Sequence, residues 1–370
     1  MTSRPAYRVP PLAELGGDLT GDEPIVASTF SGGGGSCAGL RMAGCRVVWA
    51  SEFVPAAAET YRANNPATPL DTRDIRDVDA GELRELLGEI DILEGSPPCS
   101  PFSTNGLLSA GWGRQKAYSG TVQRADDLFF EYARIAEGLR PKVLIAENVA
   151  GLVRGVSRGY FRLILARLRD AGYRASARLL DASWLGAPTE RRRIFIVGVR
   201  DDLALAPAFP EPLPYRRSVR DALPDCAGVM WHWGIRDASQ PAPTIQTYYT
   251  SHAELGLIMP AGTPVDPETG HDLIASMGTA YLARRGVRPA NARRLGAMAG
   301  QADEYRLEYR RPTLGELRAL GGFPPDFRLT GSYPQRWERI GRAVPPVMMR
   351  AVAATVRERI LQPLRERGAA

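Results

Sequence analysis

The chain has 370 residues, 44% of them hydrophobic and 24% charged, which excludes disordered and fibrous classes. No stretch reaches the roughly 18–20 consecutive apolar residues of a membrane span, and four cysteines without C-x-x-C spacing exclude a disulfide framework. The formal net charge of +6 permits a polyanionic partner without demanding one.

Apolar runs of strand length alternate with amphipathic runs of helix length from residue 24 to residue 200. Strands are expected at 24–30, 45–52, 70–75, 90–95, 142–149, 173–186 and 191–200. Helices are expected at 36–42, 56–65, 80–88, 127–140 and 160–172. This alternation predicts an α/β fold with a doubly wound, mostly parallel sheet.

The alternation stops after residue 200. Residues 201–310 are rich in Pro, Gly and Arg and suggest short irregular pieces of a smaller inserted domain. Helical patterns return at 313–327 and 345–362. We therefore expect a leader over 1–23, one domain built from 24–200 and 311–370, and a second domain over 201–310. The leader lacks the apolar core of a signal peptide, so a bacterial or phage-type cytoplasmic location is expected.

Four consecutive glycines, Gly32 to Gly35, follow the first strand and open a helix. The second strand ends at Glu52, where a carboxylate can accept hydrogen bonds from a ribose diol. The setting favours a nucleoside-containing cofactor over a plain tight turn. The glycine spacing is not that of a dinucleotide site, and the glycine loop contains no lysine that could bind a triphosphate.

Cys99 lies in "EGSPPCSPFS", just beyond a strand end and after two prolines that stiffen the turn. Doubly wound folds place their sites at the carboxyl ends of strands, so this cysteine is a candidate nucleophile. The alternative is a buried structural cysteine.

Six segments in order resemble the motifs of the DNA cytosine-5 methyltransferase family: "FSGGGG", "SPPCSPFS", "AENVAGL", "ERRRIFIVGVR", "RRPTLGELRALGGFPPDF" and "RIGRAVPP". They cover about residues 25–200 and 310–355. The resemblance implies a class I S-adenosylmethionine-dependent fold, double-stranded DNA as partner, a flipped-out target cytosine and a role in restriction-modification.

The resemblance also implies the roles of the catalytic residues. The Cys99 thiolate would add to carbon 6 of cytosine and activate carbon 5. Glu147 would protonate or hydrogen-bond N3 and accept from the 4-amino group. Arg191 and Arg193 would point to one face of their strand and hold the base carbonyl and the nearby phosphate. Residues 100–127 would close over the flipped nucleotide as a lid.

By the same resemblance, S-adenosylmethionine would lie against twelve residues. The glycine loop would line its methionine part, Glu52 would take the ribose hydroxyls, and Phe53 would stack on adenine. The predicted residues are Phe30, Gly32, Gly34, Gly35, Glu52, Phe53, Asp74, Ile75, Pro98, Leu128, Arg342 and Val344. The family often has an acid at the start of the glycine motif, where this chain has Ser28 and Thr29.

Residues 201–310 match the family's variable target-recognition region. Eight arginines lie between residues 281 and 311, and they favour a phosphate-contacting face over a solvated surface run. We expect DNA contacts from Ser103, Arg284, Arg285, Arg288, Arg293 and Arg294.

The last motif departs from the family pattern, because Glu338 replaces its Gln and Arg342 replaces its Asn. An arginine about 4–5 Å from a sulfonium, at an effective dielectric constant of about 20, costs roughly 3–4 kcal/mol. Arg342 would turn to solvent or pair with Glu338, or the enzyme would be impaired, or the cofactor would carry a compensating negative charge. Carboxy-S-adenosylmethionine carries such a charge, and its product would be 5-carboxymethylcytosine.

Two other functions stay open: a cytosine-5 methyltransferase acting on transfer RNA, and a non-catalytic DNA-binding relative. The family's transfer-RNA members usually carry a Cys-Phe-Thr signature, which this chain lacks. We expect a monomer with no metal and no membrane partner.

Overall fold

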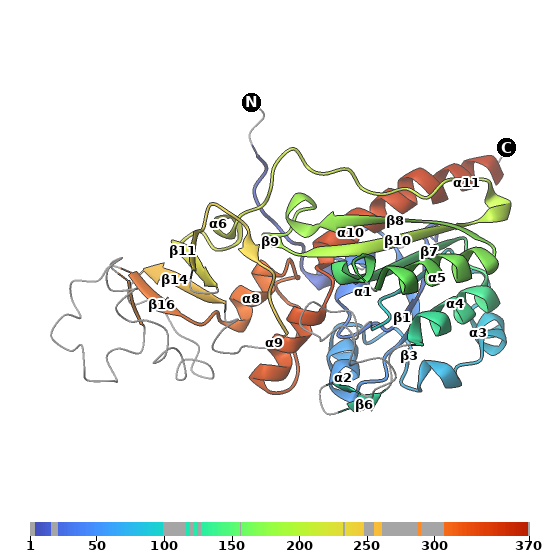
Figure 1. Ribbon diagram of the computed structural model, residues 1–370, viewed down its shortest axis with the longest axis horizontal. Coiled ribbons are helices and arrows are strands. Elements are labelled where there is room, and N and C mark those ends of the chain that lie inside the picture. The colour runs from blue at the N-terminus through green and yellow to red at the C-terminus, as the bar shows by residue number, and fades with distance from the viewer. Residues whose placement is uncertain are drawn as a thin grey trace.

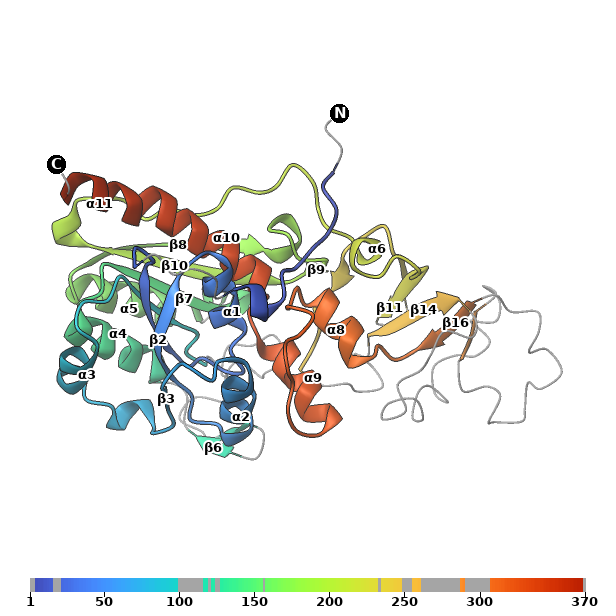
Figure 2. The ribbon, with the colours of Figure 1, turned by 180° about the vertical axis from the view of Figure 1, so that it is seen from behind.

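The computed structural model describes residues 4–15, 21–98, 116–118, 121–123, 127–155, 157–231, 234–247, 255–260, 287–289 and 307–368. Two lobes are visible in opposite views (Figures 1 and 2). The larger lobe contains a seven-stranded sheet and the smaller lobe a five-stranded sheet. The helices α8 and α9 lie between them.

The larger sheet has the strand order β3-β2-β1-β4-β7-β10-β8. Its strands are β1 (Ile25–Thr29), β2 (Arg46–Ser51), β3 (Leu70–Asp71), β4 (Ile92–Gly95), β7 (Val143–Val149), β8 (Tyr173–Asp181) and β10 (Arg192–Arg200). The pairs from β3 to β7 are parallel, whereas β10 runs antiparallel to both β7 and β8. The predicted doubly wound, mostly parallel sheet is confirmed, with β10 as the reversed strand.

Helices cover both faces of this sheet, as expected for strands that are apolar on both sides. On one face α1 and α10 pack with the β-strands in a single hydrophobic cluster, to which α2 adds Tyr61. On the other face α3, α4 and α5 form a second cluster. Their bounds are α1 (Gly35–Met42), α2 (Pro55–Asn64), α3 (Ala80–Leu87), α4 (Leu128–Leu139), α5 (Ser157–Asp170) and α10 (Pro346–Val356), which continues through a π-helical turn (Arg357–Leu361) into α11 (Gln362–Gly368).

Several boundaries differ from the sequence prediction. The third strand ends at Asp71, because Asp74 caps a 3₁₀ turn, η2 (Ile75–Asp77), instead of continuing the strand. The helix predicted over 313–327 is only α8 (Leu314–Leu320), since Gly322 adopts a φ of +70° that favours glycine. The helix α9 (Tyr333–Arg342) was not predicted, although Ser332 and Gln335 form a capping box at its start.

Within the described residues, the smaller lobe contains a sheet that its composition did not indicate. Its sheet has the order β12-β11-β14-β16-β15. The strands are β11 (Gly228–Trp231), β12 (Gly234–Asp237), β14 (Gly256–Pro260), β15 (Val287–Pro289) and β16 (Leu307–Arg310). They are short and mostly antiparallel. Strands of this length are difficult to recognise in a sequence rich in turn-forming residues.

A third hydrophobic cluster joins the smaller sheet to α8 and α9. Val229 and Leu257 of the sheet pack in this cluster with Leu317 of α8 and Trp337 of α9. A parallel pair of two-residue strands, β9 (Thr189–Glu190) and β13 (Ala242–Pro243), adds a backbone link to the start of β10. The smaller lobe is therefore held against the edge of the larger lobe where the strands end.

Candidate active site

A cavity opens at the carboxyl ends of β1, β2 and β4, the position that doubly wound folds use for ligands. Its volume is about 1020 Å³, including the open space at its mouth. Eleven of the twelve residues predicted to contact the cofactor line it. They are Phe30, Gly32, Gly35, Glu52, Phe53, Asp74, Ile75, Pro98, Leu128, Arg342 and Val344.

Gly34 is the predicted cofactor residue that does not line the cavity. It is the N-cap of α1 with a φ of +92°, and a Cβ there would lie 2.8 Å from Asn65 Nδ2. The glycine is therefore required for close packing of the loop against the end of α2, away from the cavity. Gly32 also has a positive φ, +56°, but no heavy atom lies within 4 Å of its Cβ position.

The buried Glu52 carboxylate joins the glycine loop to the start of α2. Its Oε2 accepts a hydrogen bond from Gly32 N at 2.8 Å and its Oε1 accepts one from Val54 N at 2.7 Å. Burial raises the pKa of Glu52, although these two hydrogen bonds oppose the rise. A carboxylate oxygen has a second lone pair, so both oxygens can still accept from a ligand hydroxyl.

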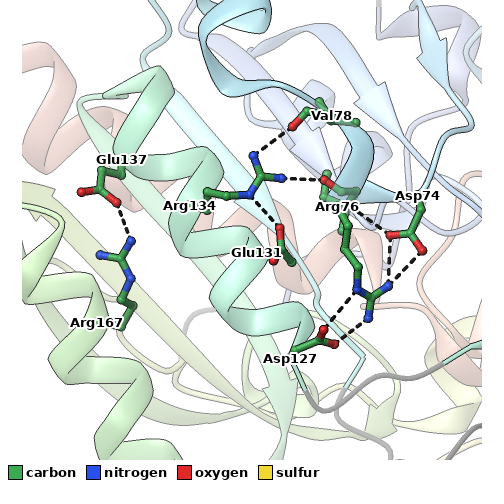
Figure 3. A network of polar contacts seen from close by, with 9 residues as sticks. Asp74, Arg76, Val78, Asp127, Glu131, Arg134, Glu137 and Arg167 are labelled. Carbon is green, nitrogen blue, oxygen red and sulfur yellow. Dashed lines mark hydrogen bonds and ion pairs between the residues drawn. The ribbon is translucent and has the colours of Figure 1, made fainter.

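An arginine clamp fixes the wall of the cavity that contains Asp74 (Figure 3). The Arg76 guanidinium donates to both Asp74 oxygens at 3.0 and 2.9 Å, and its Nε donates to Asp127 Oδ2 at 3.1 Å. Asp127 is the N-cap of α4, whose first residue, Leu128, also lines the cavity. Two walls that are distant in sequence are thus held by one side chain.

A second arginine secures the same segment to the body of α4. Arg134 donates to the carbonyl oxygens of Ile75 at 2.7 Å and Val78 at 2.9 Å, and to Glu131 on its own helix (Figure 3). The pair Arg167–Glu137 then joins α5 to α4. The backbone that carries Asp74 and Ile75 is therefore rigidly supported.

Glu147 and Arg193 meet across the β7–β10 pair. Arg193 Nε lies 2.9 Å from Glu147 Oε1, and both side chains are largely buried. Burial raises the pKa of Glu147 despite the nearby guanidinium groups of Arg193 and Arg191. A carboxyl group with a raised pKa is suited to hold or donate a proton near neutral pH.

Arg191 lies just before β10 and is 3% exposed. Within the described residues, its Nε and Nη2 have no hydrogen-bond partner, and Nη1 has only a 3.5 Å contact with Ile245 O. Burial and Arg193 lower the pKa of this guanidinium. A buried guanidinium with unmet donors is suited to an incoming carbonyl or phosphate oxygen.

Asn148 connects this group to the proline turn. Its Nδ2 donates to Pro97 O at 3.0 Å, and its Oδ1 accepts from Val149 N at 2.8 Å. The sequence analysis assigned no role to Asn148, although it lies in the "AENV" motif. The contact brings the strand end that carries Glu147 to the turn that leads to Cys99.

Several predicted residues lie outside the described part of the chain. They are Cys99, Ser103, most of the proposed lid over 100–127, of which only 116–118, 121–123 and 127 are described, and the side chains of Arg284, Arg285, Arg288, Arg293 and Arg294. Another arginine of that run is described, and it is not a surface residue. Arg310 is 2% exposed and its Nη2 lies 2.6 Å from Glu316 Oε1, so its charge is used inside the lobe.

Arg342 both lines the cavity and pairs with Glu338. Its Nε donates to Glu338 Oε1 at 2.6 Å, one turn earlier on α9. This pairing is one of the arrangements expected from the sequence. Arg73 and Arg339 also line the cavity, and neither was predicted from the sequence. The position of Arg339 follows from the packing of α9 against the glycine loop, where Gly33 approaches the Arg339 side chain.

Comparison with known proteins agrees with this geometry. The model of the family described as C-5 cytosine-specific DNA methylase matches residues 25–358. The chain belongs to this family.

The relatives and a solved structure extend the same finding. The Type II methyltransferase M.PspPI of Psychrobacter sp. (strain TA137) is 30% identical over 350 residues, covering 88% of this chain and 77% of the relative. M.NgoPII of Neisseria gonorrhoeae is 27% identical, covering 90% and 95%. A candidate DNA modification methyltransferase of an Escherichia coli prophage has a similar fold, with a TM-score of 0.60, 20% identity and coverage of 92% and 100%.

Among the described residues, no helix has the length and apolarity needed to cross a membrane. Within the same ranges, no group of three or more His, Cys, Asp and Glu side chains is placed to hold a metal ion.

Proposed function

We propose that this family member transfers a methyl group from S-adenosylmethionine to carbon 5 of a flipped-out cytosine in double-stranded DNA, through a covalent adduct with Cys99. The proposal rests on the closeness of two sites. Eleven predicted cofactor residues surround one cavity, and the turn at Pro97 and Pro98 connects the wall of this cavity to the group formed by Glu147 and Arg193.

The cavity suits the proposed cofactor. A buried acid, Glu52, would accept hydrogen bonds from a ribose diol, the Phe53 side chain would offer an apolar surface, and the Gly32 backbone leaves open space. Asp74 and Ile75, which line the same cavity, would contact the polar edge of a purine. When bound, S-adenosylmethionine would supply an electrophilic one-carbon group.

The base site suits cytosine chemistry. The Cys99 thiolate forms a bond to carbon 6, and the electron pair of the 5,6 double bond becomes available at carbon 5. Glu147 holds a proton at N3 during this addition, and Arg193 orients its carboxyl group. Arg191 offers its unmet donors to the base carbonyl or to a phosphate. Carbon 5 would take the one-carbon group that the bound cofactor supplies. Loss of the carbon 5 proton to a base from the solvent then restores the double bond, and Cys99 leaves as a thiolate.

Carboxymethyl transfer is a second candidate, because Arg342 lines the cavity. Its ion pair with Glu338 supports methyl transfer, since it offsets the repulsion between a guanidinium and a sulfonium. A carboxylated cofactor would instead compete with Glu338 for the same guanidinium.

Mass spectrometry of nucleosides from treated DNA tests both candidates. The enzyme is incubated with DNA and an equal mixture of S-adenosylmethionine and carboxy-S-adenosylmethionine. We expect 5-methylcytosine to predominate, with little change in Arg342→Asn. Predominant 5-carboxymethylcytosine, lost in Arg342→Asn by roughly 10–150-fold, would favour carboxymethyl transfer instead.

The same assay addresses the substrate. Transfer RNA offered in place of DNA should remain unmodified, and 5-fluorocytosine in DNA should trap the protein covalently. Absence of any modified base and of any adduct would indicate a non-catalytic DNA-binding protein.

A further inference from the structure

A second buried acid lies beneath the glycine loop, where the mechanism above does not use it. Glu94 lies on β4 next to Ser28 of β1 in the parallel register, and it is 1% exposed. Its Oε2 accepts a hydrogen bond from Ser28 Oγ at 2.6 Å. The Ser36 hydroxyl also hydrogen-bonds to this carboxylate.

The hydroxyl groups around Glu94 connect it directly to the cavity. Ser31 Oγ lies 2.8 Å from Ser28 Oγ, and both Ser31 and Ser36 line the cavity. Two residues after Glu94, Ser96 lines it as well. The carboxylate is therefore separated from the cavity by a single layer of serine side chains.

Within the described ranges two buried acids, Glu52 and Glu94, form no ion pair with a Lys or Arg side chain, whereas the buried acids Asp91, Glu147 and Glu338 all have one. Arg339 and Arg342 still oppose the rise in the pKa of Glu52, but no cation does so for Glu94. Burial without a counter-charge raises the pKa of Glu94 to about 7. A buried carboxylate of this kind is stabilised by a positive charge entering nearby.

We propose that Glu94 is the electrostatic partner of the cationic methionine half of the cofactor, so that cofactor binding expels a proton from this carboxyl group. The inference rests on S-adenosylmethionine being the cofactor, as proposed above. S-adenosylmethionine carries an ammonium, a sulfonium and a carboxylate, S-adenosylhomocysteine an ammonium and a carboxylate, and methylthioadenosine none of these groups. Affinity for a ligand whose ammonium or sulfonium lies near Glu94 is therefore linked to pH.

The sign of the linkage follows from the direction of the shift. Below pH 7 a ligand must displace a proton from Glu94, so its affinity rises with pH by up to about tenfold per unit. Above pH 7 the carboxylate is already charged, so the contribution of Glu94 to the pH dependence ends.

Among the residues that the structure describes, four other titratable groups interact with Glu94. They are Glu147 on β7, Cys37 on α1, Tyr61 on α2 and Tyr132 on α4. Burial raises the pKa of Cys37 to about 12 and raises those of both tyrosines well above their usual value, so these three stay neutral between pH 5 and 8. Glu147 is the one carboxylic acid among the four and requires its own control.

Isothermal titration calorimetry on the full chain tests the proposal. Binding of the three ligands is measured between pH 5.5 and 8 in buffers of different ionisation enthalpy, which counts the protons released. We expect the wild type to release up to one proton with S-adenosylmethionine near pH 6 and none with methylthioadenosine. Glu94→Gln should abolish this release, whereas Asp91→Asn, a buried acid just before the same strand, and Glu147→Gln should retain it.

The outcomes separate the two proposals. Proton release that is unchanged in Glu94→Gln, or equally large with methylthioadenosine, overturns the role of Glu94 but leaves the cofactor assignment intact. Failure of the folded wild type to bind S-adenosylmethionine at any pH overturns both. If Glu94→Gln does not fold, Ser28→Ala serves instead: loss of its hydrogen bond should move the pH window upward, and an unmoved window contradicts the proposal.

Discussion

The two sheets of this protein differ in strand direction, in the helices that cover them and in their relation to the cavity. The seven-stranded sheet is mostly parallel, is covered by helices on both faces, and ends in a cavity with fixed acids and arginines. The five-stranded sheet has short strands and depends on α8 and α9, which follow it in the chain, for its core. We therefore expect the chemistry to belong to the larger lobe and DNA selection to the smaller one.

The charged residues show the same contrast. In the larger lobe, Arg76, Arg134 and Arg193 are each held by carboxylates or carbonyl oxygens around the cavity. In the smaller lobe, the buried Arg310–Glu316 pair acts as an internal support. Variants in the larger lobe should therefore alter the reaction, whereas surface arginines of the smaller lobe should alter DNA binding alone.

The largest expected effect is that of Cys99→Ser. We expect transfer to be abolished, because an alcohol cannot replace the thiolate in adding to carbon 6. Affinity for DNA, measured by fluorescence anisotropy, should be retained. Near-normal turnover in Cys99→Ser would show that Cys99 is not the nucleophile. It would also contradict the assignment of the chemistry to this turn of the larger lobe.

Glu147→Gln should have the next largest effect. The change keeps the shape of the side chain but removes its ability to hold a proton, so single-turnover rates should fall by roughly 10²–10⁴. Because burial raises the pKa of Glu147, the wild-type rate should decline as pH rises through the pKa of this group, and the variant should lose that dependence. A Glu147→Gln variant that lost only cofactor affinity would mean that Glu147 acts on the cofactor and not on the target base.

The smallest effect is expected from replacing Arg284, Arg285 and Arg288 together with alanine. Each arginine that no longer neutralises a phosphate should reduce the slope of log affinity against log salt by about 0.9. Transfer at saturating DNA should be unaffected, and Arg236→Ala, whose guanidinium is paired with Glu190, serves as the matched control. An unchanged salt slope would mean that this run is solvated surface.

Much of the site was predictable because it depends on short-range patterns. A strand, a glycine turn and a helix follow one another in sequence, so the loop from Phe30 to Gly35 reaches the cavity whatever the rest of the chain does. Glu52 was predicted from its place at the end of the second strand, whereas Asp74 and Leu128 were predicted only from the family resemblance. Arg339 and Asn148 were not predicted from the sequence, because their contacts are with residues distant in the chain.

The sequence by itself determined most of the order of elements up to residue 200, since periodicity is a local property of the chain. The resemblance of its motifs to the family then predicted eleven of the residues that line the cavity. Tertiary structure alone decided that β10 runs antiparallel, that Gly34 packs against α2, and that Arg310 is buried. It also placed Glu94 beside Ser28, 66 residues earlier. Burial and charge pairing depend on which strands become neighbours, and that is settled only when the sheet forms.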